Sequence, residues 1–292
     1  AMNTFSHEIF KSGVKLRLSR SKRRILSREN IPIKVSDWSS SGDPDLLRGL
    51  AAIGSLLQEI SDPDAEEVTI PHDQVAALSD IQARALSLPP SVPYQLRIWG
   101  TGNWMDNSYE LNSEFTEGGQ QIFVDKRVGA FVTVGRFTYR IPDPLFTIIE
   151  EVSRFPTEKD GKIAAQAKLN DVLEASELGS AKLAPDEQIA NIRIRHVAGF
   201  SADAKGSLED PTLSPVLFAR HVIEQVADSD EILDDTQQIL DTHQRSSFIK
   251  EFSQSTHAQP TYLLESGEYV FIDPSVRPAF GAFKEICSSD AS

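Results

Sequence analysis

The sequence predicts an α+β protein in which an antiparallel β-meander is flanked by helices, as in a mixed accessory domain. Short apolar segments follow one another between residues 94 and 141, separated by turn residues, as in strands joined by tight loops. Asp-Pro pairs, which are typical of helix starts, lie on both sides of these segments. With 40% hydrophobic and 25% charged residues over 292 positions, the chain suits one large or two modest cores.

Residues 1–90 are expected to form a β/α subdomain that begins with strands. Residues 14–18 alternate apolar and cationic side chains, which is typical of a half-buried strand with its cations facing outward. A second short strand is expected at residues 31–35.

Two helices are predicted to complete this subdomain. The first begins after Asp43 with proline at its first position, and its apolar spacing continues to about Ser61. The second is predicted from Pro71 through Leu86, and the pair of prolines at 89–90 ends it because proline disfavours helical geometry in the residue before it. His72, in the first turn of this helix, is expected at the surface.

Residues 91–155 are expected to contain the meander and one helix. Turn signals lie at Gly118-Gly119 and at Gly135-Arg136. The helix is predicted from Leu145 to Val152 after Asp143-Pro144. The strand candidates are Leu96–Ile98, Tyr109–Phe115, Ile122–Val124, Phe131–Val134 and Phe137–Ile141.

Residues 156–292 are expected to form a helical and hairpin subdomain. Residues 228–235 carry five carboxylates, and blocks of like charge usually stay solvated. In chain order the other expected elements are a helix at 163–173, a strand at 192–197, an irregular loop at 201–215, a helix from Pro215 to Val226, a helix after Thr236 that reaches Phe252, a hairpin at 262–264 and 269–272, and a last helix capped by Asp273-Pro274, with a kink or a delayed start at Pro278.

The charge of the chain is distributed unevenly. Eight of its 29 basic residues lie between Lys11 and Arg28, a window without Asp or Glu, although the formal net charge of the whole chain is -14. An acidic body repels nucleic acid over most of its surface, so only a local patch attracts phosphates. A solvated strand with outward cations is the alternative explanation. The candidate DNA-binding residues are Lys15, Arg17, Arg20, Lys22, Arg23, Arg24 and Arg28.

No pattern of a known reaction centre is found in the sequence, so no catalytic residue, metal or cofactor is predicted. The phosphate-binding G-x-x-x-x-G-K-[ST] loop, the H-E-x-x-H zinc motif and the G-x-S-x-G elbow are absent from the 292 residues. A metal-dependent nuclease remains an alternative, because such enzymes need carboxylates that converge on a divalent ion. Its candidate residues are Asp125 with Lys126, or Glu268 and Asp273 with Lys284.

Several short segments carry a resemblance to a known family over about residues 10 to 286. They are Ile70-Pro71-His72, Leu88-Pro89-Pro90 with Leu96-Arg97-Ile98, Gly129-Ala130 with Tyr139-Arg140-Ile141-Pro142-Asp143-Pro144-Leu145, and Tyr269-Val270-Phe271-Ile272-Asp273-Pro274. In this order they resemble the region upstream of the motor in bacterial Swi/Snf-type helicase-like ATPases of the DEAD/DEAH superfamily two, many of them encoded in anti-phage defence loci. These segments mark strand ends and helix caps, and none is catalytic.

The resemblance implies a non-catalytic N-terminal accessory domain that contacts DNA or a defence partner and regulates a motor. Its expected partners are the C-terminal helicase motor in the same chain, double-stranded DNA and a defence-system protein, so the sequence is expected to be a fragment of a longer chain. A stand-alone protein-interaction module with an acidic docking surface is the second hypothesis. A single cysteine, Cys287, and the lack of a membrane-spanning apolar stretch fit the cytoplasm.

Overall fold

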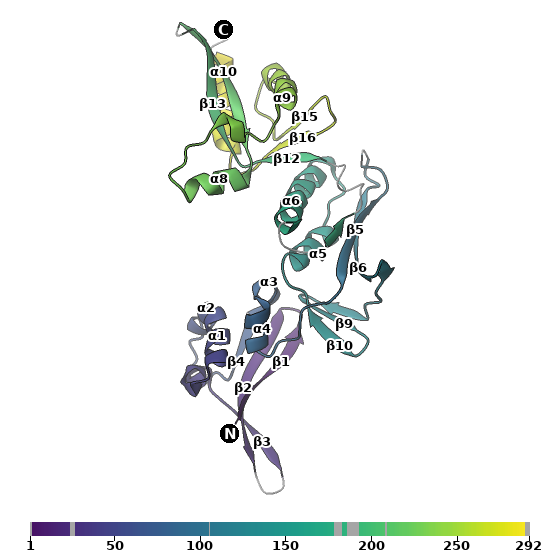
Figure 1. Ribbon diagram of the computed structural model, residues 1–292, viewed down its shortest axis with the longest axis vertical. Coiled ribbons are helices and arrows are strands. Elements are labelled where there is room, and N and C mark those ends of the chain that lie inside the picture. The colour runs from purple at the N-terminus through teal and green to yellow at the C-terminus, as the bar shows by residue number, and fades with distance from the viewer. Residues whose placement is uncertain are drawn as a thin grey trace. The chain divides into compact units, whose positions relative to one another are not determined.

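The computed structural model describes residues 2–23, 27–104, 106–177, 183–185, 193–207 and 209–289, and it confirms the α+β fold (Figure 1). The chain divides into two compact units. Unit 1 comprises residues 1–98, 112–153 and 180–184, and unit 2 comprises residues 99–111, 154–179 and 185–292. The predicted division at residues 90 and 155 stays a prediction.

Strand β2 (Gly13–Arg23) is the centre of a four-stranded antiparallel sheet in unit 1. Strand β1 (Met2–Phe10) pairs along one side of β2, while β3 (Arg28–Pro32) and β4 (Glu67–Pro71) share the other side. The apolar residues of β2 at positions 14, 16 and 18 are at most 1% exposed, which confirms the predicted half-buried strand.

The second predicted strand is only partly present. Strand β3 ends at Pro32, and the chain turns at Val35 into the 3-10 helix η1 (Val35–Ser41), so the prediction for residues 33–35 is wrong. Trp38 in η1 is fully buried and its indole N–H donates to the carbonyl of Ile33. Burial of this large ring holds η1 against the sheet and prevents the strand from continuing.

The predicted helices of unit 1 are present but interrupted. Helix α1 (Pro44–Ala52) begins as expected, with the Asp43 carboxylate accepting from the N–H of Asp45, but it ends nine residues before Ser61. Gly54, a poor helix former, begins the separate helix α2 (Gly54–Gln58). Likewise α3 (His72–Ala77) and α4 (Asp80–Ala85) replace one helix, because Ser79 forms a capping box with Gln82 and starts a new one.

Most of the segments predicted as strands between residues 94 and 141 form strands, but in two sheets. Residues 122–124 lie outside any strand, between β7 and β8, so the prediction of a strand there is wrong. One sheet has the order β11-β5-β6-β7, with β5 (Gln95–Thr101) and β6 (Glu110–Glu117) crossing the boundary between the units. The other has the order β10-β9-β8. Helix α5 (Leu145–Ser153) follows close to its predicted position. The remaining strands are β7 (Gln120–Gln121), β8 (Lys126–Val128), β9 (Phe131–Val134), β10 (Phe137–Arg140) and β11 (Leu183–Pro185).

His72 is buried, which contradicts its predicted surface position. Its Nε2 donates to the carbonyl of Phe10 at 2.7 Å and its Nδ1 accepts from the N–H of Ala130 at 3.1 Å. Gly129 makes this possible, because a Cβ at this position, with its φ of +54°, would lie 2.2 Å from Cγ of His72. The ring therefore ties β1, α3 and the β8–β9 turn together.

Unit 2 is built on helix α6 (Lys159–Glu177), a three-stranded sheet and a long hairpin. In the sheet, β16 (Tyr269–Ile272) lies between β12 (Ile194–Val197), which is parallel to it, and β15 (Thr261–Leu263), which is antiparallel. The predicted hairpin at 262–272 is thereby confirmed. The core contains the buried aromatic side chains Phe248, Phe252, Tyr262, Phe280 and Phe283.

Two predictions for unit 2 are wrong. The expected loop at 201–215 is the hairpin of β13 (Gly199–Ser207) and β14 (Asp210–Phe218), and α8 (Arg220–Ala227) begins five residues after Pro215. Pro215 lies in β14 because a two-stranded hairpin leaves one side of each strand without a neighbouring strand. Helix α9 (Thr242–Gln254) begins at the Asp241 capping box, after the short η2 (Asp235–Gln237), and α10 (Arg277–Ser289) has the delayed start.

Candidate nucleic-acid interface

The basic residues of β2 lie on two opposite faces of its sheet. Side chains alternate along a strand, so Lys15 and Arg17 share one face while Arg20 and Lys22 share the other. The second face is also the core face, since it carries the buried residues at positions 14, 16 and 18. The cationic edge that the sequence predicts as one surface is therefore divided.

Acidic residues neutralise the first of these faces. The Glu67 carboxylate lies 2.7 Å from Nη2 of Arg17 and 3.7 Å from Nζ of Lys15. The hydrogen bond with Arg17 lowers the pKa of Glu67, and the same bond raises the pKa of Arg17. Glu66 and Glu8 also act electrostatically on Arg17, so this face offers little net positive charge to a phosphate.

The second face keeps more of its charge, although Glu29 lies opposite Lys22 in the register of β2 and β3 and Asp37 lines the same groove. Arg20 and Lys22 are exposed, and no carboxylate in the described part of the chain forms an ion pair with either of them. Arg20 makes a polar contact instead: its Nε lies 3.5 Å from Oδ1 of Asn3. Both side chains line a groove of about 440 Å³ between the β2–β3 ribbon and η1, whose other lining residues are Asn3, Ile31, Pro32, Ile33, Lys34, Asp37 and Ser40.

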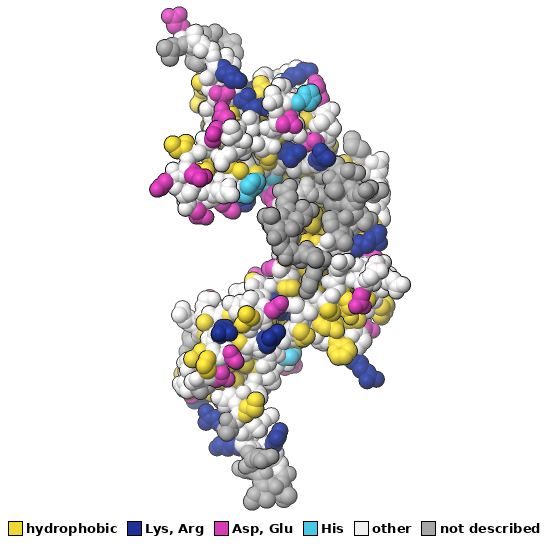
Figure 2. Space-filling model, viewed as in Figure 1, with side chains coloured by type: hydrophobic (Ala, Val, Ile, Leu, Met, Phe, Trp, Pro, Cys, Tyr) yellow, Lys and Arg dark blue, Asp and Glu magenta, His cyan; other side chains and the backbone are white. Residues whose placement is uncertain are grey.

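The β2–β3 ribbon extends beyond the helices of unit 1 (Figure 1), and Lys and Arg side chains gather at this end (Figure 2). Its register runs from Ser19 opposite Pro32 to Arg23 opposite Arg28, so two arginines face each other across the strands. Arg28 is exposed. Arg24 and the side chain of Arg23 lie outside the described residues. The structure thus brings Arg20 and Lys22 together and separates them from Lys15 and Arg17.

Lys34 is a groove residue that the sequence reasoning missed. Its Nζ lies 2.6 Å from a carboxylate oxygen of Asp64, and this hydrogen bond raises the pKa of Lys34. It follows the basic window in the sequence, and only the turn from β3 into η1 brings it to the ribbon. Its charge is compensated by Asp64, so Arg20 and Lys22 dominate the groove.

Four residues of the nuclease alternative, Asp125, Glu268, Asp273 and Lys284, are held by other partners. The Glu268 carboxylate accepts from Nε of Arg195 and Nε2 of Gln244, both at 3.0 Å. Lys284 donates to the carbonyl of Phe252 at 2.6 Å, and Asp125 accepts from the N–H of Gly135. Among the described residues no group of three His, Cys, Asp or Glu is arranged to hold a metal ion.

Asp273, the last of these residues, belongs to a charged cluster in unit 2. The imidazole of His196 donates from Nδ1 to Asp171 at 2.5 Å and from Nε2 to Asp273 at 2.7 Å, and Arg220 lies 3.0 Å from Asp273. Burial opposes the charged form of His196, but its two carboxylate partners outweigh burial and raise its pKa. Burial also raises the pKa of Asp273, yet hydrogen bonds from Ser275 and His196 lower it to about 2.

The aromatic side chains Trp104 and Tyr109, in the loop that follows β5 in the chain, belong to unit 2. Tyr109 is 4% exposed, and burial raises its pKa to about 12. Trp104 packs edge to face on Tyr109 and lies under the ammonium group of Lys162, which donates to the carbonyls of Trp104 and Asp106. These rings hold the loop in place.

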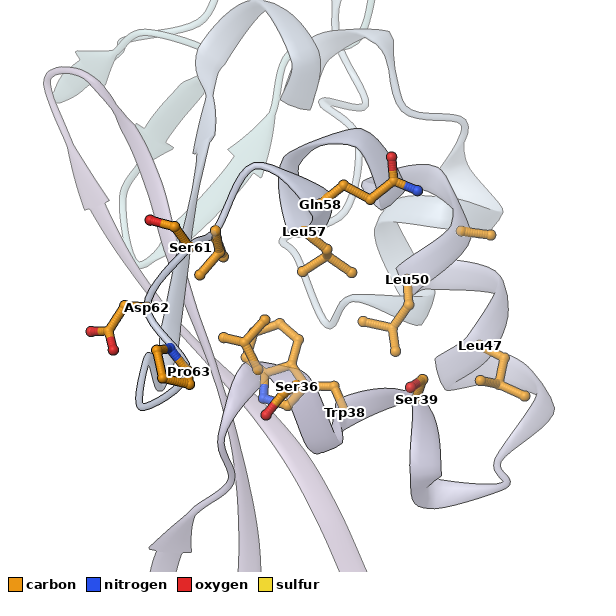
Figure 3. A pocket seen from close by; sticks show the side chains of 13 residues that line it. Ser36, Trp38, Ser39, Leu47, Leu50, Leu57, Gln58, Ser61, Asp62 and Pro63 are labelled. Atoms are coloured by element: carbon orange, nitrogen blue, oxygen red, sulfur yellow. The ribbon is translucent and has the colours of Figure 1, made fainter.

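Unit 1 has a second, apolar pocket of about 480 Å³ between η1 and helices α1 and α2. The side chains of Trp38, Leu50 and Leu57 surround it, with Gln58 and Asp62 at its rim (Figure 3). It contains no cation, so it is distinct from the groove at the ribbon.

Comparisons with known proteins identify no relative. No family model matches the chain, and no curated protein matches it. In the part of the chain that the structure describes, no helix is long and apolar enough to span a lipid bilayer.

Proposed function

We propose that this chain is a non-catalytic accessory domain that binds duplex DNA through the β2–β3 ribbon, with Arg20 and Lys22 at the groove beside η1 contacting the phosphates. The observation that supports this most directly is the pair Arg20 and Lys22, which are exposed on one face without an ion-pair partner among the described residues. Two exposed cations on one face attract the phosphates of a nucleic acid backbone.

The form of the ribbon favours a duplex. A two-stranded antiparallel ribbon fits the major groove of B-DNA, where its flanking cations meet phosphates. The rest of the chain is acidic, with a formal net charge of -14 overall, so binding is confined to the ribbon and orients the DNA relative to unit 1.

The resemblance to Swi/Snf-type ATPases adds a role for this contact. In this proposal the domain positions DNA for a helicase motor that follows in the same chain, regulates that motor, or docks a defence-system protein, in the bacterial cytoplasm. No ATP hydrolysis and no DNA cleavage are expected of the domain itself.

Replacing Arg20 and Lys22 together with alanine is expected to abolish most of the DNA affinity at low salt. Each phosphate contact contributes about 0.9 to the slope of log affinity against log salt, so the slope should become shallower by about 1.8. Fluorescence anisotropy of a labelled duplex over a range of salt concentrations measures both quantities.

The matched control is the double variant Lys15→Ala with Arg17→Ala. It removes the same charge from the same strand, but from the face that Glu67 neutralises. Its affinity and salt slope should stay near those of the parent. Equal losses in the two double variants would refute a contact at the groove, and unchanged affinity in both would favour the protein-interaction module.

A further inference from the structure

Strand β1 pairs with β2 along one edge, and among the described residues no strand pairs with its other edge. The carbonyl of Leu18 accepts from the N–H of Ile33, so the even-numbered residues of β2 direct their backbone groups toward β3 and β4. The odd-numbered residues of β2 therefore bond to β1, where their partners are the even-numbered residues. It follows that Asn3, Phe5, His7 and Ile9 direct their N–H and C=O groups outward.

This edge lacks the features that usually prevent strand pairing. Edge strands are commonly protected by lysine, proline or a bulge. Residues 2–10 contain neither lysine nor proline, and their register with β2 is continuous from Met2 to Phe10. Within the described part of the chain, the outward backbone groups of these four residues have no hydrogen-bond partner.

We propose that a second copy of this chain pairs with the β1 edge, antiparallel, with Ser6 opposite Ser6 of the second copy. In this register Asn3 faces Ile9 and Phe5 faces His7, so all four outward residues of each copy are paired and about eight backbone hydrogen bonds form. A register centred on Phe5 leaves Ile9 unpaired, and one centred on His7 leaves Asn3 unpaired. The alignment on Ser6 therefore satisfies the most backbone groups.

Charge and shape favour this occupant. Glu8 is the only formal charge in residues 2–10, and in this register it faces Thr4 of the second copy, so like charges are not opposed. A groove of about 490 Å³ lies beside Asn3 and Phe5, lined by Leu46 and by Ile81, which is 59% exposed. Ile9 of the second copy, which faces Asn3, enters this groove with its apolar side chain.

A cysteine at position 6 tests the register. The Ser6 pair is not hydrogen-bonded across the new interface, and such pairs have a Cα separation of about 4.5 Å, within the range of a disulfide. The variant Ser6→Cys, made in full-length protein with Cys287→Ser to remove the native thiol, should form a covalent dimer under mild oxidation. Thr4→Cys in the same background is the matched control, because two residues at position 4 would lie about 14 Å apart.

A backbone change tests the edge itself. His7→Pro removes one outward N–H but leaves the ladder between β1 and β2 intact. It should shift the protein toward monomer in sedimentation velocity and reduce the yield of the Ser6→Cys dimer severalfold, with an unfolding midpoint close to that of the parent. A parent that sediments as a monomer at every concentration overturns the proposal. Equal cross-linking at positions 4 and 6 also overturns it. A dimer that His7→Pro leaves unchanged does so as well.

Discussion

Replacing Arg140 with methionine is expected to lower the free energy of unfolding of unit 1 by about 3–5 kcal/mol. Arg140 is completely buried, and its Nη1 donates to the carbonyls of Val75 and Leu78 at 3.1 and 2.8 Å. Its Nη2 donates to Asp80 and Ser91. Methionine preserves most of the side-chain volume. The loss of stability therefore measures the cost of leaving the carbonyls at the end of α3 without a hydrogen-bond donor.

Arg136→Met is the matched control for this variant. Arg136 is exposed in the turn of the same hairpin, and substitutions at such positions usually change stability by no more than about 0.5 kcal/mol. Hydrogen exchange of the β2 amides, with the core amides of unit 2 as the internal reference, measures the change in unit 1. Similar exchange rates in the two variants would show that Arg140 does not hold α3 to β10.

The cluster of Asp171, His196 and Asp273 is expected to stabilise unit 2 most strongly between about pH 3.8 and 6.5. The pKa of His196 is raised above 6.5 in the folded protein, so its contribution is complete below pH 6.5 and is lost as the pH rises through the folded value. The pKa of Asp273 falls from 3.8 to about 2, so its contribution is present above pH 3.8 and is lost as the pH falls toward 2. The shift of Asp273 corresponds to about 2 kcal/mol.

His196→Gln should remove this dependence. The expected result is a loss of about 2–3 kcal/mol near pH 5.5, because the variant leaves the carboxylates of Asp171 and Asp273 without their shared cation. The difference from the parent should shrink above neutral pH. Urea unfolding followed through hydrogen exchange of β16 measures it over the pH range. His243→Gln, at an exposed position of α9, should keep the parent profile, and an identical profile for His196→Gln would contradict the assignment.

Local signals in the sequence predicted the elements whose stability is local. The alternation at residues 14–18, the Asp43-Pro44 helix start and the hairpin at 262–272 depend on neighbouring residues, and each is present. The hairpin of β13 and β14 was not predicted because much of it is exposed and polar. It therefore lacks the alternation of apolar and polar residues that indicates a strand. The break at Ile53, next to Gly54, shows that the helix can be interrupted beside a residue of low helix propensity although the apolar spacing continues.

The candidate interface was predictable in part. Lys15 and Arg17 have odd numbers while Arg20 and Lys22 have even numbers, so the alternation of side chains along a strand places the two pairs on opposite faces. This division could be predicted from the sequence. The neutralisation by Glu67 could not, because it depends on the pairing of β2 with a strand 50 residues away. The His196 cluster was missed for the same reason, since its two carboxylates are 25 and 77 residues distant.

Arg20 and Lys22 lie on the same face of β2 as the buried Leu18, directly beyond it along the strand. Burial of Leu18 thus fixes where Arg20 stands, so the groove exists only while unit 1 is folded. A polyanion that occupies the groove binds the native state alone and must raise its unfolding midpoint in proportion to the logarithm of its concentration. Heparin titrated into a thermal melt should therefore protect the parent protein and leave the Arg20→Ala, Lys22→Ala variant unprotected.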